Sequence, residues 1–415
     1  MRDTDLYQEL LGLKHPWNVA GVDLKTEARM VVVDVECADK TLWVDPDGEG
    51  RAHIHGWSLR EWRHLDTCQF QTIIRAKVPR VKLQDGSTKE VAVPWAERYS
   101  RLTKHMEAFA IRVLNATQNV SAASKLLNMT WDQVNGVMKR AVKRGLKRRE
   151  NEPVKHAGID EKAISRGHRY ATIISDLDRS RVWEVIEGRT QEDAERAWDT
   201  MNEEQLSGIE AVAMDMWPAY MNSARTKVPE ADIVHDKFHV SKHASEAVDK
   251  VRRQEAKTLA IQGDTTLKKT KYVWLRSHDD LRRSEAAAIR ELRRADLKTS
   301  RAWKQKESLS RFWDYHSRRA AENYLKRWYA SAIRTRLTPV KALARLVKNH
   351  TEGLLNYIDH RITNATSEAH NSVIQLIKAT ARGLPNFDKF RTRVLFFCGA
   401  LEMAPSGVSL TKPTP

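Results

Sequence analysis

Cysteine, long apolar runs and an apolar leader are scarce or missing in this sequence of 415 residues. Its three cysteines, Cys37, Cys68 and Cys398, are too few and too scattered for a disulfide framework or a four-cysteine zinc site. Apolar stretches such as 30–33 and 394–397 are far shorter than the roughly 20 residues of a membrane-spanning helix. The first residues include acids and no apolar core, which argues against a secretory signal. We therefore expect a cytoplasmic protein with reduced thiols and no membrane segment.

Positive charge is in excess. The chain has 71 Lys and Arg against 54 Asp and Glu, a net charge of +17 and a pI near 9.7. Such a surplus most often neutralises a polyanion, so nucleic acid is the first partner to consider. Ribosomal and membrane-surface proteins share this property, and charge alone does not decide between them. The length favours about two to four domains, each with its own core.

The N-terminal region combines short β-rich runs at 29–36, 40–44 and 70–78 with turn signals at 46–48 and 85–86. These features predict a small β-rich module. From residue 99 the apolar spacing changes to that of a helix. The residues expected on one helical face are Leu102, Met106, Phe109 and Val113.

A helix-turn-helix outline follows. Residues 121–127 predict a short helix, Asn128 and Met129 a turn, and Thr130 with Gln133 a capping box that begins a second helix. The second helix should bury one side and present the other to a DNA groove. Seven of the eleven residues 139–149 are Lys or Arg, which suits phosphate contacts. The residues expected inside are Val134, Val137 and Met138, and the candidate DNA-binding residues are Gln133, Asn135, Lys139, Arg140, Lys143, Arg144, Lys147 and Arg148. The alternative is a solvated helical hairpin that touches nothing, because short outlines of this kind are weak patterns.

Beyond residue 156 the apolar spacing alternates between strands and helices. It predicts strands at 156–163, 170–176 and 182–187, a helix at 191–206, a strand at 211–216, a helix at 218–227 and a strand at 231–236. Three hairpin-connected strands followed by helix, strand, helix and strand is the order of the ribonuclease-H-like α/β fold. The region after residue 240 is charged and helical, with no strand signal, and predicts a helical insertion.

The expected organisation has six parts. They are a β-rich N-terminal module (1–95), a helix-turn-helix domain (96–150), the first part of a ribonuclease-H-like catalytic domain (151–240), a helical insertion (241–350), the last part of the catalytic domain (351–402) and a frayed tail (403–415). Within the insertion, Trp303, Trp313 and Trp328 are expected to fill a core rather than to stack on DNA.

Two carboxylates occupy neighbouring strands of that fold. Asp160 lies in the first strand and Asp215 at the end of the fourth, each after apolar residues where an ionised carboxylate is costly unless a cation compensates it. A pair of divalent cations relieves their repulsion and supplies what phosphodiester chemistry requires. Glu368, at the beginning of a late helix, fits the third position. Spacing alone leaves other acids open, namely Glu161, Asp176, Asp178 and Asp236.

A series of short motifs adds to this interpretation. They are WRHLD (62–66), PRV (79–81), VPWAE (93–97), GIDE (158–161), MDMW (214–217), DKFH (236–239), FWDY (312–315), KRWY (326–329), HRITNA (360–365), IQLIK (374–378) and FRTR (390–393). In this order they resemble bacterial insertion-sequence transposases of the ISL3 family, which carry an Asp-Asp-Glu triad on a ribonuclease-H-like domain. The resemblance runs nearly end to end.

The resemblance implies that Asp160, Asp215 and Glu368 are catalytic and bind Mg²⁺, with Mn²⁺ as a substitute. It points to Asp236 and His239 as accessory residues, with a helix cap as the alternative role for the histidine, and more weakly to His370. It implies DNA strand cleavage and transfer of 3′-hydroxyl ends, with terminal inverted repeats and target DNA as partners. A homodimer or larger assembly associated with the bacterial nucleoid is then expected.

One departure from the family concerns zinc. Relatives usually carry a zinc-binding cysteine cluster near the N-terminus, but here only Cys37 remains, with Lys40 and Leu83 where partners would be expected. We therefore do not predict zinc and expect a degenerate, zinc-ribbon-like module. The histidines that might have substituted, His53, His55 and His64, are more often surface or core residues.

Two alternatives to a transposase stay open at this point. One is a catalytically inactive DNA-binding regulator, suggested by the eroded cysteine cluster. The other is a structure-selective nuclease of the same fold that does not join strands.

Overall fold

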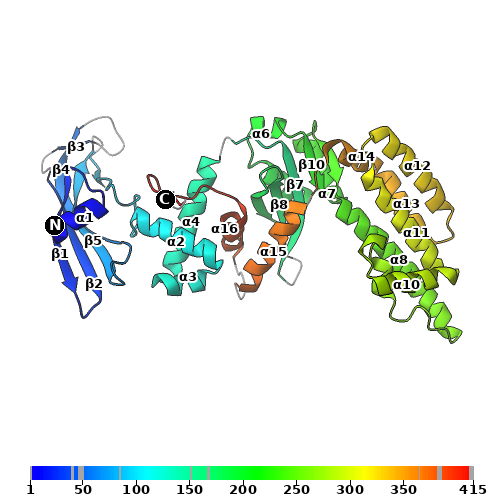
Figure 1. Ribbon diagram of the computed structural model, residues 1–415. Coiled ribbons are helices and arrows are strands. Elements are labelled where there is room, and N and C mark those ends of the chain that lie inside the picture. The colour runs from blue at the N-terminus through cyan, green and yellow to red at the C-terminus, as the bar shows by residue number, and fades with distance from the viewer. Residues whose placement is uncertain are drawn as a thin grey trace. The chain divides into compact units, whose positions relative to one another are not determined.

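The computed structural model describes residues 2–38, 42–44, 51–83, 86–149, 152–165, 169–363, 365–380 and 386–410. The chain forms two compact units, one of residues 1–149 with 401–415 and the other of residues 150–400 (Figure 1). Across the described residues, no helix combines the length and the apolar composition that a membrane crossing requires.

The first unit begins with helix α1 (Asp3–Leu10) and a six-stranded sheet. The strands are β1 (Trp17–Lys25), β2 (Met30–Cys37), β3 (Leu42–Val44), β4 (Arg51–Arg63), β5 (Gln71–Lys82) and β6 (Thr88–Glu90). They lie in the order β1-β2-β5-β4-β3, with β6 on β5, and only the β2–β5 pair is parallel among those described. Strands β2, β3 and β5 fall in the three predicted runs, whereas β1, β4, β6 and α1 were not predicted. The expected turn at 46–48 lies outside the described residues.

Three tryptophans pack against one another in the core beside this sheet. Trp95, which follows β6, meets the rings of Trp17 and Trp62 edge to face, with centroids 4.9 and 5.4 Å apart. All three side chains are buried, in the arrangement that aromatic pairs prefer. The segment that leads to the next helices is thereby fixed to the sheet.

Three helices complete the helix-turn-helix part: α2 (Lys104–Thr117), α3 (Val120–Leu127) and α4 (Trp131–Arg148). Asn128 ends α3 in the left-handed region, with φ of 49°, and the capping box of Thr130 and Gln133 is present. Val134, Val137 and Met138 are fully buried, as predicted. The predicted face of α2 was wrong at Phe109, which is 41% exposed, because the helix packs through Ala110, Ile111 and Leu114 one position away.

The C-terminal segment packs against α4. We expected residues 403–415 to be frayed, but Leu401, Met403 and Ala404 are buried. The Arg144 guanidinium donates to the Met403 carbonyl at 2.5 Å, and Gly145 makes room for Leu401, whose Cβ lies 2.6 Å from where a Cβ on residue 145 would stand. These contacts correct the expectation for the start of the tail, while residues 411–415 lie outside the described part.

The second unit contains a five-stranded mixed sheet. Its strands are β7 (His156–Ser165), β8 (Arg169–Asp176), β9 (Arg181–Glu187), β10 (Ala211–Met214) and β11 (Asp232–His235). Their order is β11-β10-β7-β8-β9, with β7, β8 and β9 antiparallel and β7, β10 and β11 parallel. The connecting helices are α5 (Gln191–Trp198), α6 (Glu203–Ser207) and α7 (Pro218–Lys227). The single helix predicted at 191–206 was wrong, because Asn202 caps a new helix there.

One face of this sheet buries an apolar core. Ile159 and Met214 pack there with Trp198 of α5 and Tyr220 of α7. Helices α15 (Ala365–Thr380) and α16 (Phe387–Cys398) also contact the sheet, at β7 and β9 (Figure 1). The architecture is therefore mixed α/β, with helices packed on the strands.

Between β11 and α15 the described chain is helical, without strands. The elements are α8 (Lys237–Ile261), α9 (Lys271–Leu275), the 3₁₀ helix η1 (His278–Asp280), α10 (Arg283–Arg294), α11 (Lys298–Ser310), the 3₁₀ helix η2 (Arg311–Asp314), α12 (Arg318–Arg334), α13 (Thr338–Asn349) and α14 (Thr351–His360). Trp303, Trp313 and Trp328 are buried in its core, which confirms the packing interpretation. Helix α14 joins this region to the sheet, where the Asn356 amide donates to the Ile233 carbonyl of β11 at 3.0 Å.

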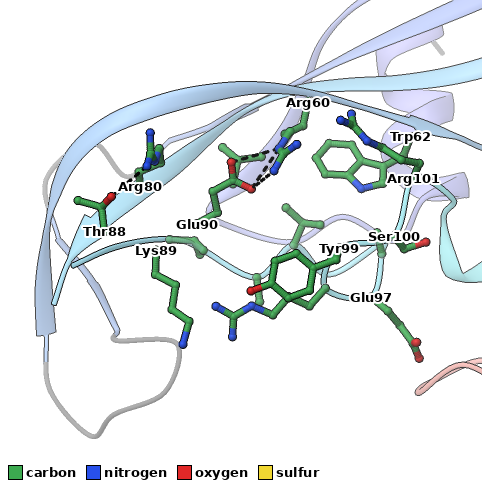
Figure 2. Close-up of a pocket in the computed structure, with 16 residues that line it drawn as sticks. Arg60, Trp62, Arg80, Thr88, Lys89, Glu90, Glu97, Tyr99, Ser100 and Arg101 are labelled. Carbon is green, nitrogen blue, oxygen red and sulfur yellow. Dashed lines mark hydrogen bonds and ion pairs between the residues drawn. The ribbon is translucent and has the colours of Figure 1, made fainter. Parts of the chain in front are cut away.

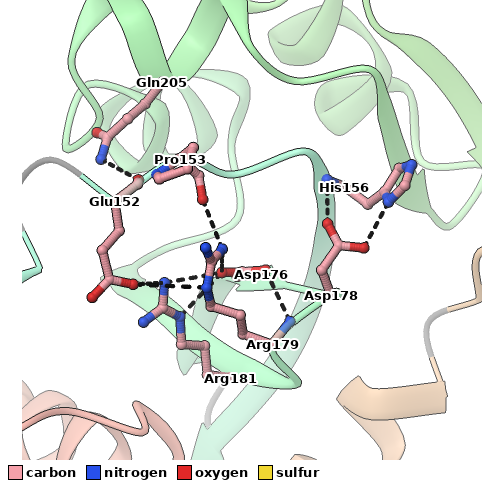
Figure 3. Close-up of polar contacts among 8 residues, drawn as sticks. All are labelled: Glu152, Pro153, His156, Asp176, Asp178, Arg179, Arg181 and Gln205. Atoms are coloured by element: carbon pink, nitrogen blue, oxygen red, sulfur yellow. Dashed lines mark hydrogen bonds and ion pairs between the residues drawn. The ribbon is translucent and has the colours of Figure 1, made fainter.

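A buried ion-pair network fixes the turn between β8 and β9 to the segment before β7 (Figure 3). Asp176 is fully buried and pairs with Arg179 at 3.2 Å and with the buried Arg181 at 3.0 Å. Arg181 also pairs with Glu152 at 2.7 Å, and Arg179 donates to the Pro153 carbonyl. The network holds the chain in place where it enters the first strand of the sheet.

We predict that Arg181→Met destabilises this sheet by about 1–3 kcal/mol, because the buried Asp176 carboxylate loses its buried partner and keeps only the half-exposed Arg179. Hydrogen exchange of peptides from β7, β8 and β9 measures the loss apart from other parts of the chain. Lys155→Met is the matched control, since its pair with Glu210 joins side chains 58% and 54% exposed. That control should cost about 0–1 kcal/mol. Equal protection losses in the two variants would contradict the prediction.

Candidate functional site

The register of β7 and β10 brings Asp160 and Asp215 together. Ile159 and Met214 are direct partners in the parallel pair, and both point into the core beside α5 and α7. Side chains alternate across a strand, so the next residue of each strand points to the opposite face. Neighbouring strands lie about 4.8 Å apart. The two carboxylates are therefore adjacent, with Asp215 directly after the end of β10.

Each carboxylate accepts a hydrogen bond from the main-chain amide of the next residue and has a contact with one side chain from a helix. Asp160 accepts from the Glu161 amide at 2.8 Å and from the Asn371 side-chain amide of α15 at 3.2 Å. Asp215 accepts from the Met216 amide at 2.6 Å, and its other oxygen lies 3.6 Å from His239 Nε2 of α8. The site is thus bordered by two helices that are far apart in the sequence.

Glu368 lies in α15, three residues before Asn371. Its side chain is outside the part of the chain that the structure describes. Among the described side chains, no group of three or more His, Cys, Asp and Glu is arranged to hold a metal ion.

The accessory residues have different surroundings. Asp236 is buried and caps α8, accepting from the Phe238 amide at 2.8 Å. His239 lies beside Asp215, and its Nδ1 is buried and has no hydrogen-bond partner among the described residues. His370 contacts the Ser180 carbonyl at 3.1 Å, at the turn between β8 and β9, and burial lowers its pKa. In the part of the chain that the structure describes, His239 is the accessory candidate with a recorded contact to a catalytic carboxylate, that of Asp215.

The sequence did not single out several residues near the carboxylates. Asn371 is one, although its spacing of three from Glu368 could have indicated it. Arg189 is another: its guanidinium lies 3.9 Å from the Tyr170 ring and 5.8 Å from the Trp217 ring, and it pairs with Glu161 at 3.2 Å. Glu161, an alternative to Asp160, therefore has an arginine partner.

Two lysines add positive charge on the Asp160 side of β7. Lys162 lies two residues after Asp160 on the same strand face, and Lys378 of α15 donates to the Ala163 carbonyl at 2.6 Å. Burial lowers the pKa of Lys162, Asp160 opposes that shift, and Lys378 adds to it. A negatively charged ligand beside Asp160 would meet both amino groups.

The basic residues of α4 divide into two sets. Lys139, Lys143 and Lys147 recur every four residues and are exposed. Arg140 and Arg144 instead pair with Glu107 of α2, both at 2.6 Å, and Glu107 is only 1% exposed. Arg148 pairs with Glu402 at 3.1 Å. The first set is available for DNA, whereas the arginines fasten α4 to its neighbours.

Two candidate DNA-binding residues need correction. Asn135 is 7% exposed, because it lies among the buried residues of α4, so it does not face a groove. The Arg144 guanidinium is occupied by Glu97, Glu107 and the Met403 carbonyl. The residue that the sequence reasoning missed is Glu107, whose position on the buried face of α2 was the available signal. Gln133 is exposed and serves in the capping box.

Comparisons with known proteins find three family matches along the chain. A transposase model of the ISL3 family matches residues 157–394, and the helix-turn-helix domain of transposase family ISL3 matches residues 91–142. The zinc finger of transposases IS204, IS1001, IS1096 and IS1165 matches residues 47–85. Along the chain, the zinc-finger match comes first, the helix-turn-helix match second and the transposase match third.

Individual relatives are also transposases by name. The transposase for insertion sequence element IS1001 of Bordetella parapertussis is 25% identical over 405 residues, 95% of this chain and 98% of the relative. The transposase for insertion sequence element IS1557 of Mycobacterium tuberculosis, found in two strains, is 26% identical over 84% of this chain and 81% of the relative.

The zinc-finger match runs against our expectation that the N-terminal module holds no zinc. The matched stretch contains a single cysteine, Cys68, which is exposed. His64 is buried, its Nδ1 lies 2.9 Å from the Thr103 hydroxyl, and burial lowers its pKa to about 4. Cys68 and His64 alone do not make a four-ligand zinc site, and among the described side chains no group of three or more His, Cys, Asp and Glu could hold a metal ion.

The transposase match alone covers more than half of the chain, and the helix-turn-helix match adds a DNA-binding domain before it. The relatives align along most of both chains. On this evidence the chain belongs to the ISL3 family of insertion-sequence transposases.

Proposed function

We propose that this transposase cleaves DNA strands and transfers their 3′-hydroxyl ends by metal-dependent phosphodiester chemistry. Asp160, Asp215 and Glu368 are the proposed metal ligands. The observation that carries the proposal is the pairing of Ile159 with Met214, which makes the two aspartates neighbours on one face. Glu368 joins them in the proposal because Asn371, one helical turn later, reaches Asp160, and residues three apart share a helix face.

We take the second unit to contain a ribonuclease-H-like domain. Support comes from the strand order β11-β10-β7-β8-β9, with three antiparallel strands followed by two parallel ones. The proposal divides the domain into residues 151–240 and 351–402, with helices of residues 241–350 as an insertion. Residues 1–95 and 96–150 are the proposed N-terminal module and helix-turn-helix domain.

The donor set fits a hard divalent cation such as Mg²⁺, or Mn²⁺ in its place, since both ions prefer carboxylate oxygens. Within the described part of the chain, neither Asp160 nor Asp215 forms an ion pair with Lys or Arg. Two adjacent carboxylates that lack a direct ion pair with Lys or Arg repel each other, and a bound cation removes that cost. When bound, such ions activate the attacking oxygen and stabilise the leaving oxygen.

The chain's own residues orient the ligands and the DNA. The Asn371 amide fixes one oxygen of Asp160, and His239 stands beside Asp215. Lys162 and Lys378 are placed to bind the phosphates that flank the scissile bond. In this proposal the two lysines position the DNA backbone next to Asp160 and Asp215.

DNA recognition is assigned to α4. We propose that Gln133, Lys139, Lys143 and Lys147 contact the terminal inverted repeats of the insertion sequence, while Arg140 and Arg144 keep α4 in place through Glu107. Because two ends must be joined to one target, the active species is proposed to be a dimer or a larger assembly on DNA.

The catalytic assignment is tested by Asp215→Asn. Loss of one metal ligand should remove several kcal/mol of transition-state stabilisation, a rate loss of roughly 1,000-fold, with DNA affinity unchanged. The measurement is strand cleavage and strand transfer with Mg²⁺ on a plasmid that carries the reading frame and its flanking DNA. Asp178→Asn is the control, since Asp178 pairs with His156 away from the site. Full activity in Asp215→Asn would refute the assignment, and cleavage without joining would indicate a nuclease.

Asn371 is predicted to be a positioning residue. Removing a partner that orients a metal ligand typically costs about 10–100-fold in metal affinity or activity. Asn371→Ala should therefore raise the Mg²⁺ concentration needed for half-maximal cleavage, and excess Mg²⁺ should restore much of the rate. Gln375→Ala, an exposed change on the next turn of α15, should leave the Mg²⁺ titration unchanged. A rate loss that Mg²⁺ does not relieve would argue against this role.

The division of α4 predicts different consequences for its two basic sets. Replacing Lys139, Lys143 and Lys147 by alanine should reduce the slope of log affinity against log salt by about 3, close to one unit for each lost phosphate contact. Filter binding over a series of KCl concentrations measures this slope. The charge-matched control replaces the exposed Lys14, Lys25 and Lys77 of the sheet module. Equal slope changes for both triples would show a general charge effect instead.

A further inference from the structure

A hollow of about 280 Å³ lies in the first unit, between the sheet and the segment that leads to α2 (Figure 2). Strands β4, β5 and β6 form one side, and residues 91–101 form the other. Helix α2 begins at Lys104, shortly after this segment. The residues that line the hollow therefore lead directly into the helix-turn-helix part.

The lining of the hollow is cationic. Five basic side chains line it against two acidic ones, and both acids already have arginine partners. Glu90 accepts two hydrogen bonds from Arg60 Nε, at 3.1 Å each, and one from Arg60 Nη2 at 2.7 Å, while Glu97 pairs with Arg144. The exposed basic residues of the lining are Arg80, Arg98 and Arg101. An anion entering the hollow meets net positive charge.

Tyr99 stands at the edge of this hollow in a costly conformation. Its side chain is 88% exposed, and its backbone φ of 61° lies in the left-handed region, where glycine or asparagine is favoured. A ring this exposed buries little apolar surface that would offset the cost of the backbone conformation. Such a combination is expected where a residue serves binding.

The loop that carries Tyr99 is fixed at both ends. The Lys104 amide donates to the carbonyl of the buried Trp95 at 2.8 Å, and the Ser100 amide donates to the Glu97 carbonyl at 3.0 Å. The Ser100 hydroxyl closes the turn by bonding both the amide and the carbonyl of Leu102. Arg98 lies 5.4 Å from the Tyr99 ring centroid. The ring and the arginine are therefore presented together on a rigid support.

We propose that this hollow is a second DNA-contact site, in addition to the one formed by α4. Arg80, Arg98 and Arg101 bind backbone phosphates, and the Tyr99 ring stacks on a base of the bound DNA. Spaced arginines with one exposed aromatic ring suit a nucleic acid, which offers both phosphates and flat bases. The inference rests on DNA binding by the first unit and extends it to a surface that needs no zinc.

The test measures binding of the full-length protein to a fluorescein-labelled DNA duplex of mixed sequence with a single-stranded overhang, whose unpaired bases offer a face for stacking, by anisotropy over a series of KCl concentrations. Tyr99→Gly should weaken binding about 10-fold, the size of one lost stacking contact, while Tyr99→Phe should bind like the wild type. Because glycine relieves the left-handed strain, Tyr99→Gly should unfold at the same temperature as the wild type or higher. The Arg80→Ala, Arg101→Ala double variant should reduce the salt slope by about two.

Arg29→Gly is the matched control. Arg29 is also exposed with a positive φ, 49°, in the same sheet module, but it does not line the hollow. It should leave affinity nearly unchanged. Three outcomes would each overturn this inference and leave the proposed function intact. They are wild-type affinity in Tyr99→Gly, an unchanged salt slope in the double variant, and a loss of affinity in Arg29→Gly equal to that in Tyr99→Gly. Absence of DNA binding by the wild type would contradict the proposed function as well.

Discussion

The parallel register between β7 and β10 is the constraint on which the candidate site depends. It pairs Ile159 with Met214, so that both side chains enter the same core while the following residues turn to the other face. A shift of one position in either strand would bury one aspartate among Trp198 and Tyr220 and expose an apolar residue. The fully buried Ile159 and Met214 thus specify where the two carboxylates lie. Apolar packing on one face sets the geometry of the charged face.

The helix-turn-helix part uses charge in a different way. Glu107 is buried at the interface of α2 and α4, and an unpaired carboxylate there would be strongly destabilising. Arg140 and Arg144, one turn apart on α4, supply the pairs. Their spacing leaves Lys139, Lys143 and Lys147 one position away, on a face that stays exposed. Helix α4 therefore carries one row of basic residues that stabilises the fold and a second row that is exposed. The net charge of the helix does not show which row is which.

These cases show which features the sequence could predict. Strands β7 to β11 were found because each contains an apolar or alternating run near turn signals, and the helices of the helix-turn-helix part because their caps are local signals. Strand β4 was missed because charged and histidine side chains cover both its faces, as in Arg60 and His55. Partners distant in the chain were also missed: Asn371 reaches Asp160 across 211 positions, and Glu107 meets Arg140 across 33. Local patterns predict elements, whereas such contacts depend on how the elements pack.

The N-terminal sheet raises the question of what stabilises a module that matches a zinc-finger family with a single cysteine in the matched stretch. Small zinc modules need the metal because they bury too little apolar surface to fold alone. Here Trp62 and Ile74, inside the matched stretch, pack in one core with Trp17 and Trp95, which lie outside it. Strand β1 and the segment after β6 thus add the apolar area that a short metal-bound module lacks. Packing across this larger sheet can supply folding free energy of the kind that zinc supplies in such modules, and the buried His64 adds a hydrogen bond with the Thr103 hydroxyl.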